Sequence, residues 1–332
     1  MMDQFEKLRG MVSNTPLLEI DLRYNGKPKK IFAKAEYYNL TGSIKDRVAY
    51  YILKKAYAAG ELKPGDRIIE ATSGNTGISF CAIGAYLGHK VIIYMPDWMS
   101  RERILLMESF GAEVRLVSKE EGGFLGSIAM TEEAAKQGGV FLPRQFSNEE
   151  NVNAHIEDTG AEILRQLSAI GRRPDGVVAG VGTGGTIVGL SKAFRAVNPA
   201  AKAYPLEPAA SPTLSTGYKT GQHKIQGISD EFIPPIVHLD ELDEVVAVDD
   251  VDAIIMAQML SRQLGLGVGI SAGANLLGAI LKSEGLAPDA TMVTVFADDN
   301  KKYLSTDYAK DWEIKPGMMT EKIELLGYRA YR

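Results

Sequence analysis

The sequence has little cysteine and no long hydrophobic run, and both absences narrow the classes of protein to consider. Its 332 residues include one cysteine, Cys81, so no intrachain disulfide can form. Because Cys81 lies in the apolar run Ile78-Ser79-Phe80-Cys81-Ala82-Ile83, we expect a buried thiol. No segment approaches the ~18 apolar residues of a membrane span, and the first residues lack the apolar core of a signal peptide. We therefore expect a cytoplasmic protein that does not bind membranes.

Excess positive charge and metal-ligand patterns are also missing. The net charge is −5, and the isoelectric point is about 5.6, so the surface does not attract nucleic acid. The histidines His89, His155, His223 and His238 show no ligand spacing with carboxylates or cysteine, so we expect no metal site. The length is typical of about two domains of ~150 residues each.

Short β-branched segments alternate with helical segments along nearly the whole chain. Predicted strands are 30–36, 67–71, 90–95, 113–117, 176–181, 203–207, 244–248 and 291–296. Predicted helices are 44–58, 75–87, 101–110, 126–136, 152–167, 187–197, 249–264 and 274–284. Apolar strands separated by helices are typical of a parallel sheet covered on both faces. This pattern predicts an α/β protein with two doubly wound open sheets.

One glycine-rich segment, Gly182-Thr183-Gly184-Gly185-Thr186, follows an apolar strand and opens a helix. Glycine lets backbone N–H groups approach an anion, and the helix N-terminus adds positive potential. The segment matches neither a dinucleotide fingerprint nor a nucleotide P-loop, so a small phosphate fits it better. A plain strand-to-helix turn is the alternative.

A second polar segment, Thr72-Ser73-Gly74-Asn75-Thr76-Gly77, lies in the same kind of strand-to-helix connection. One N-cap residue is enough to begin a helix, and four short polar side chains exceed that need. We interpret the segment as a binding loop for a substrate carboxylate, with a richly capped helix start as the alternative. Ligands of open α/β sheets bind beyond the carboxyl ends of strands, where both segments are expected.

Two further residues complete the set of groups that pyridoxal phosphate needs. Lys45 lies just inside a predicted helix, in Asn39-Leu40-Thr41-Gly42-Ser43-Ile44-Lys45-Asp46-Arg47. It could be a solvated surface charge, but burial beside a cofactor would lower its pKa and make it a Schiff-base nucleophile. Ser271, in Gly269-Ile270-Ser271-Ala272-Gly273, is either a helix cap or a hydroxyl for a ring nitrogen.

In this order, the four clusters resemble the cysteine synthase and cystathionine β-synthase family of pyridoxal phosphate enzymes. The resemblance extends from Ser13-Asn14-Thr15-Pro16-Leu17 to Tyr303-Leu304-Ser305-Thr306. It implies the fold type II architecture, similar to the tryptophan synthase β-subunit, with the cofactor between two lobes. Residues 35–150 would form a smaller mobile lobe that binds substrate, and residues 1–34 plus 151–332 a larger lobe with the phosphate cradle. The resemblance also implies a homodimer.

The resemblance assigns a role to each site residue. Lys45 would form the internal aldimine, Asn75 would lie beside the cofactor's phenolic oxygen, and Ser271 would bind the pyridine nitrogen. The substrate carboxylate would be held by Thr72, Ser73, Thr76 and Gln145, and the phosphate by Gly182, Thr183, Gly184, Gly185 and Thr186.

The implied chemistry is β-replacement. A substrate amine displaces Lys45, which then removes the α-proton. A leaving group departs from the β-carbon, and a nucleophile adds to the resulting aminoacrylate. A neutral serine at the ring nitrogen makes the ring a mild electron sink, suited to β-elimination.

One segment departs from the family pattern. Sulfide-accepting cysteine synthases have Gly-Ile-Gly-Ala-Gly-Phe-Ile-Pro where this chain has Gly227-Ile228-Ser229-Asp230-Glu231-Phe232-Ile233-Pro234. A carboxylate at Asp230 disfavours hydrosulfide as the acceptor; it could orient an amino-acid acceptor or act as general base for water. The alternative is that Asp230 points to solvent or caps a turn with Ser229.

The sequence therefore favours a cysteine synthase-like reaction, in which O-acetylserine and sulfide give cysteine. The alternative, favoured by Asp230, is a cysteine-consuming reaction that releases sulfide and gives serine or lanthionine. Cystathionine formation is a lesser alternative, because the chain has no N-terminal haem-binding segment and no room for a regulatory module. A non-catalytic protein on the same fold is the remaining hypothesis, and the 311–332 tail has no assigned role.

Overall fold

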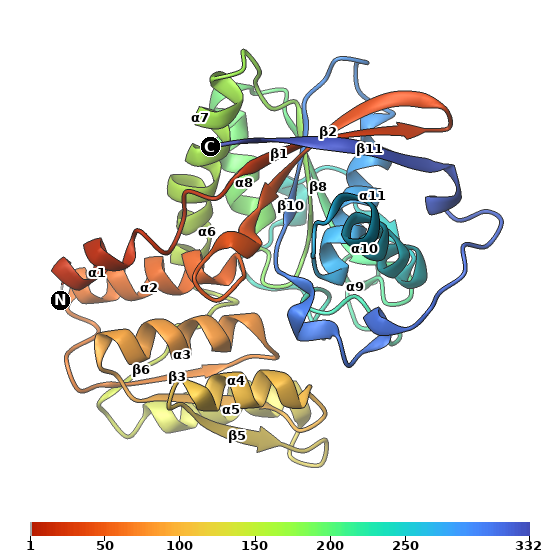
Figure 1. Cartoon of the computed structure of the whole chain (residues 1–332). Helices are drawn as coiled ribbons and strands as arrows, with labels where there is room; N and C mark the ends of the chain where they lie inside the picture. The colour runs from red at the N-terminus through yellow and green to blue at the C-terminus, as the bar shows by residue number, and fades with distance from the viewer. Residues whose placement is uncertain (1) are drawn as a thin grey trace. The chain divides into compact units, whose positions relative to one another are not determined.

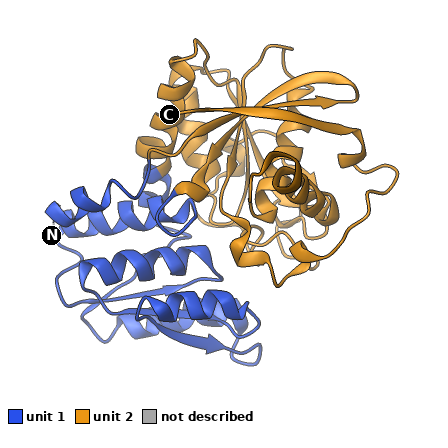
Figure 2. Cartoon of the chain, in the orientation of Figure 1, with its two compact units in different colours: residues 1–13, 39–154 blue, residues 14–38, 155–332 orange. Residues whose placement is uncertain are grey.

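The computed structural model describes residues 2–332 as two compact units (Figure 2). Unit 1 contains the described residues up to Ser13 together with Asn39–Ala154, and unit 2 contains Asn14–Tyr38 and His155–Arg332. The N-terminal residues therefore belong to the smaller unit, whereas the sequence placed them in the larger one. The cause is apolar burial, because Phe5 and Leu8 of α1 (Met2–Leu8) join the core cluster that contains Val48 and Ile52.

Unit 1 is built on a four-stranded parallel sheet with apolar clusters on both faces. Its strand order is β5 (Glu113–Val117), β4 (Val91–Pro96), β3 (Arg67–Ala71), β6 (Val140–Phe141). Ile68 and Ile93 join one core cluster, and their chain neighbours Ile69 and Ile92 join another. Because successive strand residues point to opposite faces, both faces are buried. The helices are α2 (Lys45–Ala59), α3 (Asn75–Leu87), α4 (Arg101–Ser109), α5 (Gly123–Ala135) and α6 (Glu149–Ala154).

Unit 2 is built on a seven-stranded mixed sheet, ordered β11-β1-β2-β10-β7-β8-β9. The strands are β1 (Leu17–Tyr24), β2 (Lys27–Ala35), β7 (Gly176–Gly180), β8 (Lys202–Pro208), β9 (Val246–Val248), β10 (Met292–Phe296) and β11 (Ile323–Tyr331). Its helices are α7 (Ala161–Ser168), α8 (Gly185–Val197), α9 (Thr213–Thr216), α10 (Asp250–Leu264) and α11 (Ile270–Ser283). Figure 1 shows α7 and α8 on one face of this sheet, and α10 and α11 on the other. The predicted α/β class with two sheets is thus confirmed.

Three strands, β1, β6 and β11, were not predicted, and the larger sheet is not wholly parallel. β1 pairs antiparallel with both β2 and β11. The 311–332 tail, to which the sequence assigned no role, thus supplies the edge strand β11. Short 3₁₀ helices complete the chain at Glu36–Tyr38, Leu239–Glu241, Asn300–Tyr303, Asp307–Ala309 and Thr320–Lys322.

The predicted helix 152–167 is interrupted by a π-helical turn, η2 (His155–Gly160), between α6 and α7. Gly160 permits this path, because a Cβ there would lie 2.6 Å from the Cβ of Ala193 in α8 and 2.9 Å from the carbonyl oxygen of His155. Such π-turns often occur at functional sites.

The expectation for Cys81 is confirmed: it is 1% exposed within α3, and burial raises the pKa of its thiol to about 12. A thiol of this kind is unreactive. None of the helices in residues 2–332 has both the length and the apolar character needed to cross a lipid bilayer.

Candidate active site

Lys45 is the first residue of α2, and a closed turn fixes it there. The buried carboxylate of Asp46 accepts hydrogen bonds of 2.7 Å from both the backbone nitrogen and the hydroxyl of Thr41. The same hydroxyl lies 3.5 Å from that of Ser79 in α3. Lys45 is half-buried. The amine of Lys45 therefore extends from a rigid helix start. This helix start is tied to α3 at Ser79, one helical turn after Asn75.

The Thr72–Thr76 segment connects the end of β3 to the start of α3. The hydroxyl of Thr72 accepts a bond of 3.2 Å from the backbone nitrogen of Gly74. Gly77 lets the first helical turn pack closely on the loop, because a Cβ there would lie 2.7 Å from Cγ2 of Thr72. The first N–H groups of an α-helix have no partner within the helix and carry its positive end. This geometry suits a carboxylate.

Gln145 lies against both ends of this loop and is buried. Its Oε1 accepts a bond of 2.6 Å from the hydroxyl of Thr76, and its Nε2 donates to the carbonyl oxygen of Ala71 at 2.9 Å. Residues far apart in sequence are thus brought together in unit 1, with Ser73 and Asn75 in the same connection.

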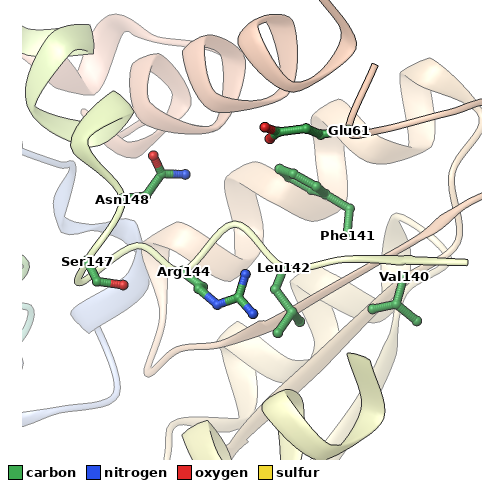
Figure 3. Close-up of a pocket in the computed structure, with 7 residues that line it drawn as sticks. All are labelled: Glu61, Val140, Phe141, Leu142, Arg144, Ser147 and Asn148. Atoms are coloured by element: carbon green, nitrogen blue, oxygen red, sulfur yellow. The ribbon is translucent and has the colours of Figure 1, made fainter. Parts of the chain in front are cut away.

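The neighbours of Gln145 line a separate hollow of about 330 Å³ (Figure 3). Arg144, Ser147 and Asn148 form part of its wall, with Glu61 and the apolar residues 140–142. No residue predicted for substrate or cofactor binding lines it. The segment from Arg144 to Asn148 therefore contributes to two places: Gln145 to the Thr72–Thr76 loop, and its neighbours to the hollow.

The predicted phosphate cradle follows β7 and leads into α8. Gly184 has a left-handed φ of 86°, and a Cβ there would lie 2.0 Å from Cγ2 of Val237. A Cβ at Gly182 would lie 2.4 Å from the carbonyl oxygen of Gly227. Only glycine fits at these two positions, which brings backbone N–H groups to the N-terminus of α8. The cradle suits a phosphate.

His155 supports this cradle, although the sequence considered it only as a metal ligand. It is fully buried at the start of η2. Its Nδ1 lies 2.9 Å from the hydroxyl of Thr159, and its Nε2 lies 3.3 Å from that of Thr186. Sequence spacing gives no signal for this contact, because the π-turn that creates it is not visible in the helical pattern.

Ser271 is the second residue of α11 and is 6% exposed. One turn further, Asn275 accepts a bond of 2.8 Å from the backbone nitrogen of Gly180 and donates one of 2.7 Å to the carbonyl oxygen of Val295. Asn275 therefore fixes the start of α11 to the ends of β7 and β10. Its position four residues after Ser271 is the only sequence signal for this role.

Asp230 follows a strained turn that is anchored beside the cradle. Ser229 has a φ of 57°, and its backbone nitrogen donates to the carbonyl oxygen of Val181 at 2.8 Å. Its hydroxyl donates to the carbonyl oxygen of Ser211 at 2.9 Å. His223, whose pKa is lowered by burial, donates from Nε2 to the carbonyl oxygen of Ser229. Asp230 itself is half-buried.

Contacts of Gly182 with Gly227 and of Gly180 with Ile228 bring this turn against the strand end that leads into the cradle. The turn is therefore built into the cradle rather than free in a long loop. A Ser229 in the left-handed region is uncommon for a non-glycine residue, and strain of this kind persists where surrounding contacts impose it.

Comparison with known proteins gives a consistent result. Residues 8–298 match the family model described as pyridoxal-phosphate dependent enzyme. A "probable cysteine synthase" from Bacillus subtilis is 41% identical over 298 residues, which cover 90% of this chain and 95% of that protein. A hydrogen sulfide-producing enzyme from Fusobacterium nucleatum has a crystal structure with 55% identity and a TM-score of 0.95, covering 98% of each chain. An aspartate-to-asparagine variant of that enzyme was solved with an α-aminoacrylate intermediate.

Proposed function

Since the chain belongs to the pyridoxal-phosphate dependent enzyme family, with cysteine synthases among its relatives, we propose that it consumes L-cysteine and releases sulfide. The reaction class is β-replacement on a serine- or cysteine-type amino acid through an aminoacrylate. The proposal concerns the leaving group and the acceptor. The observation that carries it is Asp230, a carboxylate on a turn built into the phosphate cradle.

Each residue set has a distinct task in this proposal. The bound cofactor supplies an electron sink for the α-carbon. Lys45 holds the cofactor and moves the α-proton, while Asn75 and Ser271 bind the ring oxygen and the ring nitrogen. The substrate carboxylate is bound by Thr72, Ser73, Thr76 and Gln145, and the phosphate by Gly182, Thr183, Gly184, Gly185 and Thr186.

Asp230 selects the acceptor. A carboxylate repels an anionic hydrosulfide, so sulfide that has left is disfavoured from adding back. The same carboxylate accepts a proton from water or from the thiol of a second amino acid, which is general-base catalysis. The expected products are serine and lanthionine. The 55% identity with a hydrogen sulfide-producing enzyme supports this choice.

The cysteine synthase reaction is the second candidate, and the 41% identity with the Bacillus subtilis protein favours it. The two reactions use the same residues apart from Asp230, but sulfide is the acceptor in one and the leaving group in the other. Cystathionine formation differs only in the thiol amino acid that adds.

The test supplies the holoenzyme with L-cysteine alone and measures sulfide together with the amino-acid products. A parallel reaction contains O-acetylserine and sulfide, and a third contains L-cysteine with homocysteine. Sulfide release with serine or lanthionine, faster than cysteine formation in the parallel reaction, supports the proposal. Rapid cysteine formation with little sulfide release from L-cysteine would replace it with the cysteine synthase assignment.

We also propose that the protein acts as a homodimer, as its resemblance to the family implies. Sedimentation equilibrium should then give twice the chain mass of 36.1 kDa. A mass of one chain across the concentration range would contradict this.

A further inference from the structure

Glu70 is a buried carboxyl group at the end of β3, directly before the Thr72–Thr76 loop. Its side chain accepts a bond of 2.8 Å from the backbone nitrogen of Ala71 and another of 3.2 Å from that of Gln145. The two bonds go to different oxygens of the carboxylate. Glu70 therefore ties the strand that enters the loop to the segment that carries Gln145.

Gln145 is held at all four of its polar groups. Glu70 accepts from its backbone nitrogen, and the side chain of Asn151 donates to its carbonyl oxygen at 2.8 Å. Its side-chain amide bonds to Thr76 and to Ala71. The direction of the Gln145 amide, and through it that of the Thr76 hydroxyl, thus depends on how firmly its backbone is fixed.

We propose that Glu70 is a positioning residue for the substrate carboxylate, acting through Gln145. This inference rests on the proposed function, which assigns the carboxylate to Thr72, Ser73, Thr76 and Gln145. Glu70 does not contact the substrate in this proposal, but it orients the groups that bind the substrate carboxylate.

The ionisation of Glu70 supports this role. Burial raises the pKa of Glu70, and the hydrogen bonds from Ala71 and Gln145 lower it. Burial is the larger effect, so the pKa is about 7. The charged neighbours are Arg144, which lowers the pKa, and Glu132, which raises it and forms an ion pair with Arg144. Ionised Glu70 accepts both bonds at full strength, but a proton on either oxygen removes the negative charge and makes that oxygen a weaker acceptor. Carboxylate binding should therefore weaken as the pH falls through about 7.

The experiment titrates the holoenzyme with L-serine, follows the change in cofactor absorbance, and compares wild type with Glu70→Gln. The variant should raise the Kd for L-serine about tenfold near pH 8, the effect of about one hydrogen bond to a charged group. The ratio between variant and wild type should shrink toward pH 6, where wild type is itself protonated. Ser147→Ala, on the hollow side of the same segment, is the matched control and should leave the Kd unchanged.

Two further measurements separate positioning from general structural support. Ethanolamine, which is serine without its carboxylate, should bind wild type and Glu70→Gln equally. In a Gln145→Ala background, adding Glu70→Gln should raise the Kd for L-serine by less than about twofold, because Glu70 acts through Gln145. Equal loss of serine and ethanolamine binding, or a ratio that does not change with pH, would overturn the proposal.

Should Glu70→Gln not fold, Glu132→Gln tests the same idea without changing the hydrogen bonds of Glu70. Burial is the main cause of the raised pKa of Glu70, and the variant removes a neighbouring negative charge that raises it further, so the pH at which serine binding weakens should fall. An unshifted pH profile would overturn the inference. Because serine binding does not require sulfide release, these outcomes are independent of whether L-cysteine is the true substrate.

Discussion

At the scale of single residues, Lys45 has the most demanding role in the proposed function, because one amine would both hold the cofactor and move a proton. Its place at the start of α2, after a turn closed by Thr41 and Asp46, restricts where that amine can reach. Solvent-exposed lysines elsewhere on α2, such as Lys55, have no such turn.

Lys45→Ala should lower sulfide release by at least about 10³-fold, since it removes the nucleophile and the base together. The melting temperature of the cofactor-free protein should change little, because Lys45 is only half-buried. Turnover assays, and cofactor retained after gel filtration, measure the effect. Lys55→Ala is the control on the same helix and should behave like wild type; full activity in Lys45→Ala would refute its role.

Glu70 gives a prediction for stability as a function of pH. Its pKa is raised on folding, from 4.5 to about 7, so the folded state retains a proton that the unfolded state has lost. The unfolding free energy should therefore fall as the pH rises through this range, by about 3 kcal/mol at most. In Glu70→Gln this loss is absent, so its melting temperature relative to wild type should increase from pH 5 to pH 8. A constant difference across that range would show that Glu70 does not titrate there.

The sequence could suggest roles for residues that lie in short motifs, but not for residues whose roles depend on distant contacts. Lys45, Asn75 and the glycines of the cradle lie in short motifs whose chemistry is local. Glu70 and His155 were not predicted, because their roles depend on contacts with Gln145 and Thr186, which no local pattern reveals.

At the scale of elements, the sequence predicted local structure well and irregular structure poorly. The bounds of β3, β5 and α3 agree with the prediction, because each is a short apolar strand or a regular helix with clear limits. The turn η2 was read as continuous helix, since its cause is the close approach of Gly160 to α8.

The cradle between β7 and α8 gives the prediction for this scale. Gly184→Ala combines a left-handed φ with a Cβ 2.0 Å from Val237, so it should weaken phosphate binding and destabilise the fold by ~2 kcal/mol or more. Gly265→Ala has a left-handed φ but no atom within 4 Å of the new Cβ, and is the control for backbone strain alone. Cofactor affinity and thermal melting measure both. Equal cofactor affinities in the two variants would contradict the account of the cradle.

At the scale of the whole molecule, the edge strand β11 lies beyond residues 8–298, which match the family model. Its partner is β1, some 300 residues earlier in the chain, and Tyr331 also bonds to Glu19 at 2.5 Å. A pairing so distant in sequence cannot be predicted from the periodicity of either strand.

Removal of residues 323–332 should expose the edge of β1 to solvent. We expect a lower melting temperature and a tendency to aggregate, because an unpaired strand edge pairs with other chains. Thermal melting with light scattering measures this. Tyr328→Ser, at an exposed position of β11, is the control and should remain close to wild type; a truncated protein as stable as wild type would show that β11 is dispensable.

The central claim, that Asp230 activates the acceptor after sulfide has left, is tested most directly by the first turnover of Asp230→Asn with L-cysteine. If the carboxylate acts only in the second half of the reaction, the variant should release about one sulfide per active site rapidly and then turn over at least ~10²-fold more slowly than wild type. Rapid-mixing measurement of sulfide gives both quantities. Multiple turnovers at the wild-type rate, or loss of the initial sulfide release, would contradict the account.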